Sequence, residues 1–185
     1  MEARVLLLVA AVAGAAAPRA SANIALAGPY AVDVLEYAVC DDGEYPGVSA
    51  NFSQVVDEET KETVYRGEFT VNYDLFADDS EVQITAYRWG STGGWSRIFY
   101  HNFTEPYDYI KSNLPNIFEL FWKKIGITEK PVTPGTYHFS GLSLRGLTLQ
   151  KFSSLYYGKY KIYSKALRDG EELFCLQTLV SIYEV

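Results

Sequence analysis

The chain has 185 residues and a formal net charge of −7 at pH 7, and 48% of its residues are hydrophobic and 15% aromatic. This size fits one domain, and the apolar content disfavours intrinsic disorder. The acidic balance argues against nucleic-acid binding, which needs a cationic face. With only two histidines and two cysteines, the chain is too poor in ligands for an all-protein zinc or iron–sulfur site, so we expect no metal and no cofactor.

The first 22 residues have the pattern of a secretory signal peptide. Arg4 precedes an apolar run over residues 5–13, which is too short to span a bilayer. Ala20-Ser21-Ala22 then supplies the small residues that a signal peptidase accepts. A buried N-terminal helix is the alternative, but this run has no polar face. We expect residues 1–22 to be removed and residues 23–185 to form one secreted domain, extracellular or in the lysosomal lumen.

Secretion changes what the cysteines and two of the asparagines mean. In an oxidising compartment Cys40 and Cys175 most simply form one disulfide, which would tie the first strand to the last. The alternative, a reactive thiol, needs a nearby base, and no histidine lies close in the sequence. Asn51-Phe52-Ser53 and Asn102-Phe103-Thr104 are sequons, so Asn51 and Asn102 are predicted glycosylation sites.

Alternation of apolar and polar residues predicts strands in the first half of the domain. In the clearest run, residues 67–75, the side chains of Phe69 and Val71 would face the core together with Tyr73 and Leu75. Residues 81–89 alternate again after a turn-like cluster, and the two runs are predicted to form a hairpin. Three further strands are expected, at residues 34–39, 48–56 and 95–100.

One stretch has helical periodicity instead. Between Leu114 and Ile125 the apolar residues recur every three or four positions, with Pro115 suited to a first turn and Gly126 to a stop. Strand-like composition returns at residues 136–139 and 142–144. The tail predicts a terminal hairpin of residues 158–167 and 173–183 around an Asp169-Gly170 turn.

About eight short strands and one short amphipathic helix, without βαβ alternation, indicate an all-β protein. We expect an immunoglobulin-like antiparallel β-sandwich. The core disulfide of antibody domains joins central strands, whereas Cys40 and Cys175 lie near the ends of this domain.

Four short motifs resemble the ML lipid-recognition superfamily, in particular its ganglioside-activator branch. The C-terminal hairpin of that branch is similar to Gly158-Lys159-Tyr160-Lys161-Ile162, followed by the Asp169-Gly170 turn and Leu173-Phe174-Cys175. Its first cysteine resembles Val39-Cys40-Asp41-Asp42-Gly43, and its glycine-x-tyrosine segment resembles Pro134-Gly135-Thr136-Tyr137. The helix Asn116-Ile117-Phe118-Glu119-Leu120-Phe121 is similar to that of uncharacterised arthropod relatives.

This resemblance implies a fold and a class of ligand. The two cysteines pair in that family, and acyl chains are held in a hydrophobic cup between two sheets that do not pack fully together. Family members commonly have further disulfides around the helix and the lid, where this chain has residues such as Ser112 and Val132. We therefore expect a lid that is less constrained by covalent bonds.

A hydrophobic cup needs apolar and aromatic walls. The predicted ligand-binding residues come from the helix and from the loop between two strands: Phe118, Phe121, Trp122, Ile125, Trp89 and Trp95. Ordinary core packing is the alternative for each of them. Exposed loop tryptophans would also suit transient contact with a membrane surface.

Lys159, Lys161 and Lys165 occupy one face of a predicted strand in an acidic protein. They form either a solvated outer face that discourages aggregation or a contact for anionic head groups or an acidic partner.

No constellation in the sequence supports catalysis, and we name no catalytic residue. A nucleophile elbow, a phosphate-binding glycine loop and suitably paired carboxylates are all lacking. A hydrolase would require His138 to converge with a distant acid in a cleft. The leading hypothesis is a secreted, non-enzymatic lipid- or hydrophobe-binding protein, a carrier or presenter of lipid, with activation of glycolipid hydrolysis as one version of that role. The alternative is a secreted protein-interaction or signalling module with a fully packed sandwich, and the volume of the internal cavity separates the two.

Overall fold

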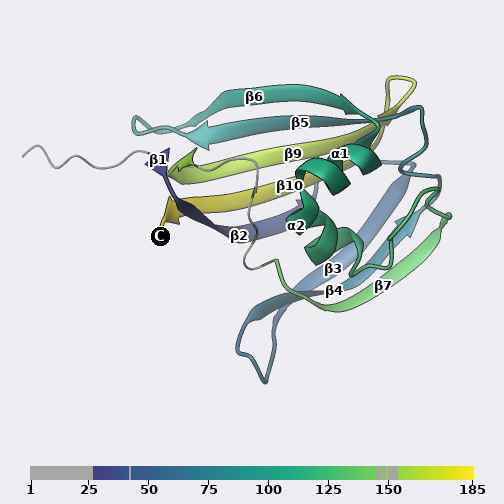
Figure 1. The fold of residues 1–185 in the computed structure, drawn as a ribbon, viewed down its shortest axis with the longest axis horizontal. Coiled ribbons are helices and arrows are strands. Elements are labelled where there is room, and N and C mark those ends of the chain that lie inside the picture. Colours follow the sequence, from purple (N-terminus) through teal and green to yellow (C-terminus); the bar gives the residue numbers. More distant parts are fainter. Residues whose placement is uncertain (1–26, 42, 145–146, 148, 150–153) are drawn as a thin grey trace, which may run out of the picture.

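The computed structural model describes residues 27–41, 43–144, 147, 149 and 154–185. The predicted signal peptide and its cleavage site before Asn23 lie outside the described residues. The described part of the chain is an antiparallel β-sandwich with short helices (Figure 1). The prediction of an all-β sandwich is therefore confirmed.

The larger sheet has five strands, and its β2 and β10 come from opposite ends of the domain. Its spatial order is β2-β10-β9-β5-β6, and every neighbouring pair is antiparallel. The predicted terminal hairpin is confirmed as β9 and β10. Phe174, Leu176, Val180 and Ile182 of β10 are buried because they lie on the face of the strand that is turned to the core. The bounds are β2 (Tyr30–Val39), β5 (Ser80–Trp89), β6 (Trp95–Thr104), β9 (Gly158–Arg168) and β10 (Glu171–Glu184).

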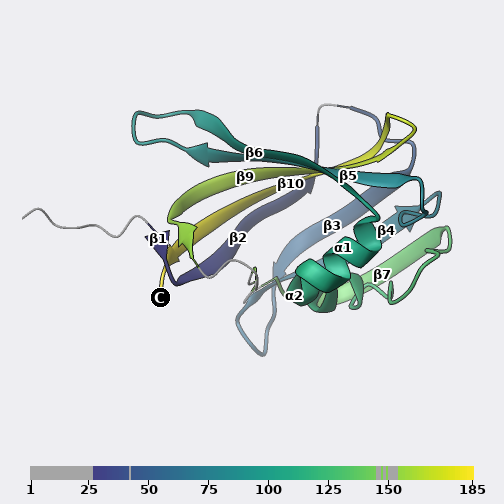
Figure 2. The ribbon, with the colours of Figure 1, turned by 45° about the horizontal axis from the view of Figure 1, so that its top comes forward.

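The smaller sheet has three strands, β3 (Val48–Val56), β4 (Thr63–Val71) and β7 (Gly135–Leu142), in the order β3-β4-β7. Phe69 and Val71 of β4 point into the core and are 2% and 1% exposed. Two short strands, β1 (Ala27–Gly28) and β8 (Leu155–Tyr156), pair separately. Figure 2 shows the five-stranded sheet facing the three-stranded one.

The predicted hairpin between residues 67–75 and 81–89 is wrong. Strand β4 pairs with β3 and β7, and strand β5 pairs with β6 and β9, so the two lie in different sheets. The chain crosses between the sheets in residues 72–79. This crossing is stabilised locally, because Leu75 and Phe76 are buried and the Asp74 carboxylate accepts the N–H of Phe76 at 3.0 Å.

Three consecutive helical segments lie between the two sheets (Figures 1 and 2). The predicted helix over residues 114–125 is present in a shorter form, as α2 (Pro115–Ile117) and the π-helical turn η1 (Phe118–Trp122). Helix α1 (Pro106–Asn113) was not predicted. It ends before Pro115, because a residue that precedes proline is disfavoured in the helical conformation, and Leu114 has φ −131°.

A disulfide and a glycine fix the chain where it leaves the larger sheet and enters the smaller one. Cys40, directly after β2, is bonded to Cys175 in β10, as predicted. The N–H of Gly47, just before β3, donates to the Leu173 carbonyl at 3.1 Å. A side chain at Gly47 would overlap the Tyr73 ring and Leu173, so only glycine allows the backbones to approach this closely.

Candidate functional site

Aromatic side chains fill the space between the two sheets. A void of about 10 Å³ remains there, which is room for about one water molecule and not for an acyl chain. Tyr37 contacts Phe52 and Phe121, with ring centroids 5.4 and 5.7 Å apart. The void is lined by Tyr37, Phe52, Phe69, Phe121, Phe139 and Leu176.

The four predicted ligand-binding residues of the helical segment all lie in or against this core. Phe118, Phe121 and Ile125 are buried, with exposures of 6%, 6% and 3%. Trp122 is partly buried and packs edge-on against Phe76, with centroids 5.0 Å apart. Contact with a ligand stays a prediction for these four residues.

The two predicted loop residues lie elsewhere. Trp89 ends β5, Trp95 begins β6, and the two are directly opposite each other in the hairpin. Their rings are 5.2 Å apart at 72°, and Trp89 is 48% exposed. The structure therefore divides the predicted binding residues into two separate groups, and a binding role for Trp89 and Trp95 also stays a prediction.

An apolar surface on the inner face of the five-stranded sheet was not singled out by the sequence. Ile84 and Ala86 of β5, Phe99 of β6 and Ile162 of β9 project to the same side, because Ala86 is opposite both Phe99 and Ile162. We call these four residues the inner patch. Their side chains are only partly buried, and Phe99 is 45% exposed.

The inner patch lies between two separate hydrophobic clusters. Along the inner side of β9, Tyr160 belongs to the smaller cluster and Ala166 packs against the larger one, with Ile162 and Ser164 between them. Ile162 packs against the smaller cluster, whereas Ile84, Ala86 and Phe99 belong to neither cluster. At the end nearer the helices, Phe103 of β6 stacks on Tyr109 of α1, with centroids 4.0 Å apart. The patch is thus a gap in the packing of an inward-facing surface.

The loop that follows the helices is held without the further disulfides that the family resemblance implies. The N–H of Val132, which is 3% exposed, donates to the Asp74 carboxylate at 2.7 Å. The Tyr107 hydroxyl donates to the Thr128 carbonyl at 2.7 Å, and Lys130 pairs with Asp108 of α1 at 2.7 Å. Hydrogen bonds and burial therefore anchor this segment where cysteines are lacking.

Several tyrosine hydroxyls inside the sandwich are held neutral. Desolvation by burial raises the pKa of Tyr73 to about 12, although the nearby Arg168 opposes the shift. Burial, and to a lesser extent the neighbouring Tyr65, also raises the pKa of Tyr37 above its usual range. The hydroxyls of Tyr65 and Tyr73 are buried and have no hydrogen-bond partner among the residues that the structure describes. This interior favours uncharged groups.

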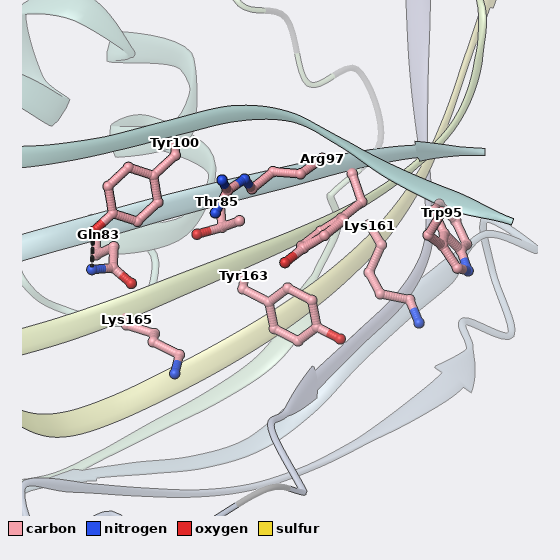
Figure 3. Close-up of a pocket in the computed structure, with 9 residues that line it drawn as sticks. Gln83, Thr85, Trp95, Arg97, Tyr100, Lys161, Tyr163 and Lys165 are labelled. Carbon is pink, nitrogen blue, oxygen red and sulfur yellow. Dashed lines mark hydrogen bonds between the residues drawn. The ribbon is translucent and has the colours of Figure 1, made fainter. Parts of the chain in front are cut away.

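The outer face of the five-stranded sheet has a groove of about 420 Å³. Figure 3 shows side chains from three adjacent strands, β5, β6 and β9, around it. Two of the three lysines singled out from the sequence line the groove, and Lys159 does not. The lining residues are Gln83, Thr85, Tyr87, Trp95, Arg97, Tyr100, Lys161, Tyr163 and Lys165.

His138 does have an acidic neighbour. Its Nδ1 lies 3.7 Å from Glu68 Oε2, the two side chains are 74% and 46% exposed, and the residues are opposite each other on β7 and β4. Neither residue lines the groove or the interior void. The described geometry thus places this pair on an open strand surface and not in a cleft.

Both predicted glycosylation sites are accessible. Asn51 on β3 and Asn102 on β6 are exposed, and their modification stays a prediction. Among the described residues, no helix is long and apolar enough to cross a membrane. The same part of the chain has no group of three histidine, cysteine or acidic side chains arranged to hold a metal ion.

Comparison with known proteins gives a likeness of fold only. No protein-family model and no curated protein matches the chain. Twelve chains of solved structures match. One is chicken MD-1, solved in complex with lipid IVa, which is 11% identical with a TM-score of 0.35 over 85% of this chain and 99% of that one. A superposition at this TM-score carries no functional argument.

Proposed function

We propose that the protein is a secreted, non-enzymatic carrier or presenter of a lipid or another small hydrophobic ligand, and that it belongs to the ML superfamily. The observation that supports this best is the inner patch, an apolar surface that faces inward and yet is left partly uncovered. The Cys40–Cys175 bond and the closing β9–β10 hairpin agree with the motifs that suggested the family.

The inner patch is suited to an acyl chain. A hydrocarbon chain that covers Ile84, Ala86, Phe99 and Ile162 would gain about 0.8 kcal/mol for each methylene removed from water. It would lie between the two core clusters, with α1 at one end. The exposed Trp89, at the far end of β5, would suit brief contact with a membrane surface during loading.

A second candidate function is favoured by the closely packed interior. A void of about 10 Å³ between the sheets is what a protein-interaction or signalling module without a ligand would have. On this view the exposed apolar side chains of β6, Ile98, Phe99 and Tyr100, would contact a protein partner.

The experiment is native mass spectrometry of the secreted protein, purified without detergent, followed by organic extraction. We expect a bound lipid or other hydrophobe to be released. Phe99→Glu, which places a charge in the inner patch, should weaken uptake of a fluorescent fatty acid by about tenfold, the equivalent of about 1.4 kcal/mol. Val56→Glu is the matched control, because Val56 is an exposed apolar strand residue on the other sheet.

One result would count against the lipid carrier, and another against the inner patch as its binding surface. A bare protein that takes up no fatty acid or glycolipid would favour the interaction module. Equal uptake by the Phe99→Glu and Val56→Glu variants would show that the inner patch is not the binding surface.

A further inference from the structure

We infer that the outer groove of the five-stranded sheet is a binding site for a small organic anion, in which a carboxylate or sulfate group is attached to a ring-shaped body. This site is separate from the inner patch, because β5, β6 and β9 present alternate residues to opposite faces of the sheet. The inference therefore does not depend on the proposed lipid function.

The register of the strands places two cations on either side of one aromatic ring. Tyr87 in β5 is directly opposite Arg97 in β6 and directly opposite Lys161 in β9. Adjacent strands are about 4.8 Å apart, so the backbones of Arg97 and Lys161 are separated by about 10 Å across Tyr87. The long side chains of both residues can reach an anionic group that sits over this ring.

The neighbouring rows of the sheet complete the groove with aromatic and neutral polar groups. Thr85 is flanked by Tyr100 and Tyr163 in the same way. The Gln83 amide donates to the Tyr100 hydroxyl at 3.0 Å, which fixes the orientation of that wall. Figure 3 shows these side chains on one side of the sheet.

The charge of the groove is opposite to that of the whole protein. Of its nine lining residues three are basic and none is acidic, whereas the chain as a whole has a net charge of −7. Lys165 is already paired with Glu172 at 2.8 Å. Arg97 and Lys161 lie over aromatic rings, with the guanidinium of Arg97 5.8 Å from the Tyr100 centroid and the ammonium of Lys161 5.1 Å from that of Trp95. Among the described residues, neither of the two forms an ion pair.

These features together define the class of ligand. Two cations without acidic partners favour an anion, and charge-assisted hydrogen bonds to a carboxylate or sulfate are the strongest that Arg and Lys make. Aromatic walls favour a ring-shaped body that can lie against them. The volume of about 420 Å³ falls within the usual range for small-molecule sites.

The test is titration calorimetry of the full secreted protein with matched neutral and anionic probes. We expect glucuronate and glucose 6-sulfate to bind and glucose not to bind, with affinity falling as salt is added. In the double variant Arg97→Gln/Lys161→Gln the affinity for both anions should fall at least about tenfold. Lys159→Gln is the matched control, because Lys159 is an exposed lysine of the same strand that does not line the groove.

Each contrary outcome would overturn the inference. If glucose binds as tightly as the anions, the groove does not require an anionic group. If inorganic sulfate binds as tightly, the groove does not require a ring-shaped body. Binding to phosphatidylcholine vesicles that contain phosphatidylserine, without binding of the soluble anions, would make the groove a membrane contact instead. Unchanged thermal unfolding of both variants shows that a loss of binding is not a loss of fold.

Discussion

The carboxylate of Asp74 accepts the backbone N–H of Val132 at 2.7 Å, from 58 residues away in the sequence. The same oxygen accepts the N–H of Phe76 at 3.0 Å. One side chain thus stabilises both the crossing between the sheets and the loop that follows the helices. This contact fixes the backbone of the loop at Val132, without a covalent bond.

Removal of this contact should destabilise the protein. Asp74→Ala leaves two part-buried N–H groups without an acceptor, and we expect a loss of about 2–4 kcal/mol in the free energy of unfolding. Asp74→Asn keeps an acceptor oxygen and should lose less. Asp78→Ala is the control, because the Asp78 carboxylate is 97% exposed and makes only a long ion pair with Lys130, at 3.9 Å. Urea denaturation measures all three, and an Asp74→Ala midpoint equal to that of Asp78→Ala would refute the role of Asp74.

The disulfide should contribute more than any single hydrogen bond. Cys40 and Cys175 are 135 residues apart in the sequence, and a loop of this length corresponds to about 5 kcal/mol in the chain-entropy model. The Cys40→Ala/Cys175→Ala variant should therefore unfold at a much lower denaturant concentration than the wild type. The native pairing of β2 with β10 continues up to this point, where the Cys40 N–H donates to the Cys175 carbonyl at 3.1 Å. An unchanged denaturation midpoint would mean that residual contacts between the two ends already restrict the unfolded chain, so that the disulfide lowers its entropy little further.

Local patterns in the sequence predicted the strands well, but they predicted poorly which strands and residues contact one another. Strand β3 has the bounds that alternation gave it, and β9 and β10 form the predicted hairpin, because strand pleat and turn chemistry are local. The pairing of β4 was mispredicted because the sequence order of two strands does not say whether the intervening turn stays in one sheet. Asp74 in that turn has a partner 58 residues away, which no local pattern contains.

The candidate sites show the same limit. The helical spacing of apolar residues pointed to Phe118 and Phe121, and both are buried. The periodicity does not distinguish a side chain that packs in the core from one that lines a ligand pocket, because both occur at the same spacing. The groove takes residues from three strands, and of these the sequence had singled out only Trp95, Lys161 and Lys165. Arg97 joins them through strand register, which follows from long-range pairing.

The buried tyrosines predict a loss of stability at alkaline pH. The folded-state pKa of Tyr73 is raised to about 12, above the ordinary value of about 10 in the unfolded chain. The contribution of the neutral Tyr73 hydroxyl to the free energy of unfolding is complete below pH 10. It is lost as the pH rises from 10 through 12, because Tyr73 ionises in the unfolded chain before it ionises in the folded protein. Tyr37 and Tyr65, whose pKa values are also raised by burial, act in the same direction. Unfolding free energies measured between pH 8 and the alkaline limit should decline, and the decline should be smaller in Tyr73→Phe.

Absorbance of tyrosinate provides an independent check on the same groups. The folded protein should hold a fraction of its tyrosines neutral at a pH where denatured protein has ionised them. Coincident titration curves for the folded and the denatured protein would contradict the burial of these hydroxyls.

Phe121→Ala measures whether the interior is packed in the absence of a ligand. The ring is 6% exposed and contacts Tyr37 and Trp122, with centroids 5.7 and 5.1 Å away. Its removal from a close-packed core should cost about 3–5 kcal/mol, because the void beside it would grow to the size of a benzene ring. Phe99→Ala, at 45% exposure in the inner patch, should cost far less. A small loss for Phe121→Ala would mean that the space between the sheets is open in solution, so that a lipid could enter beside the helices and not on the inner patch.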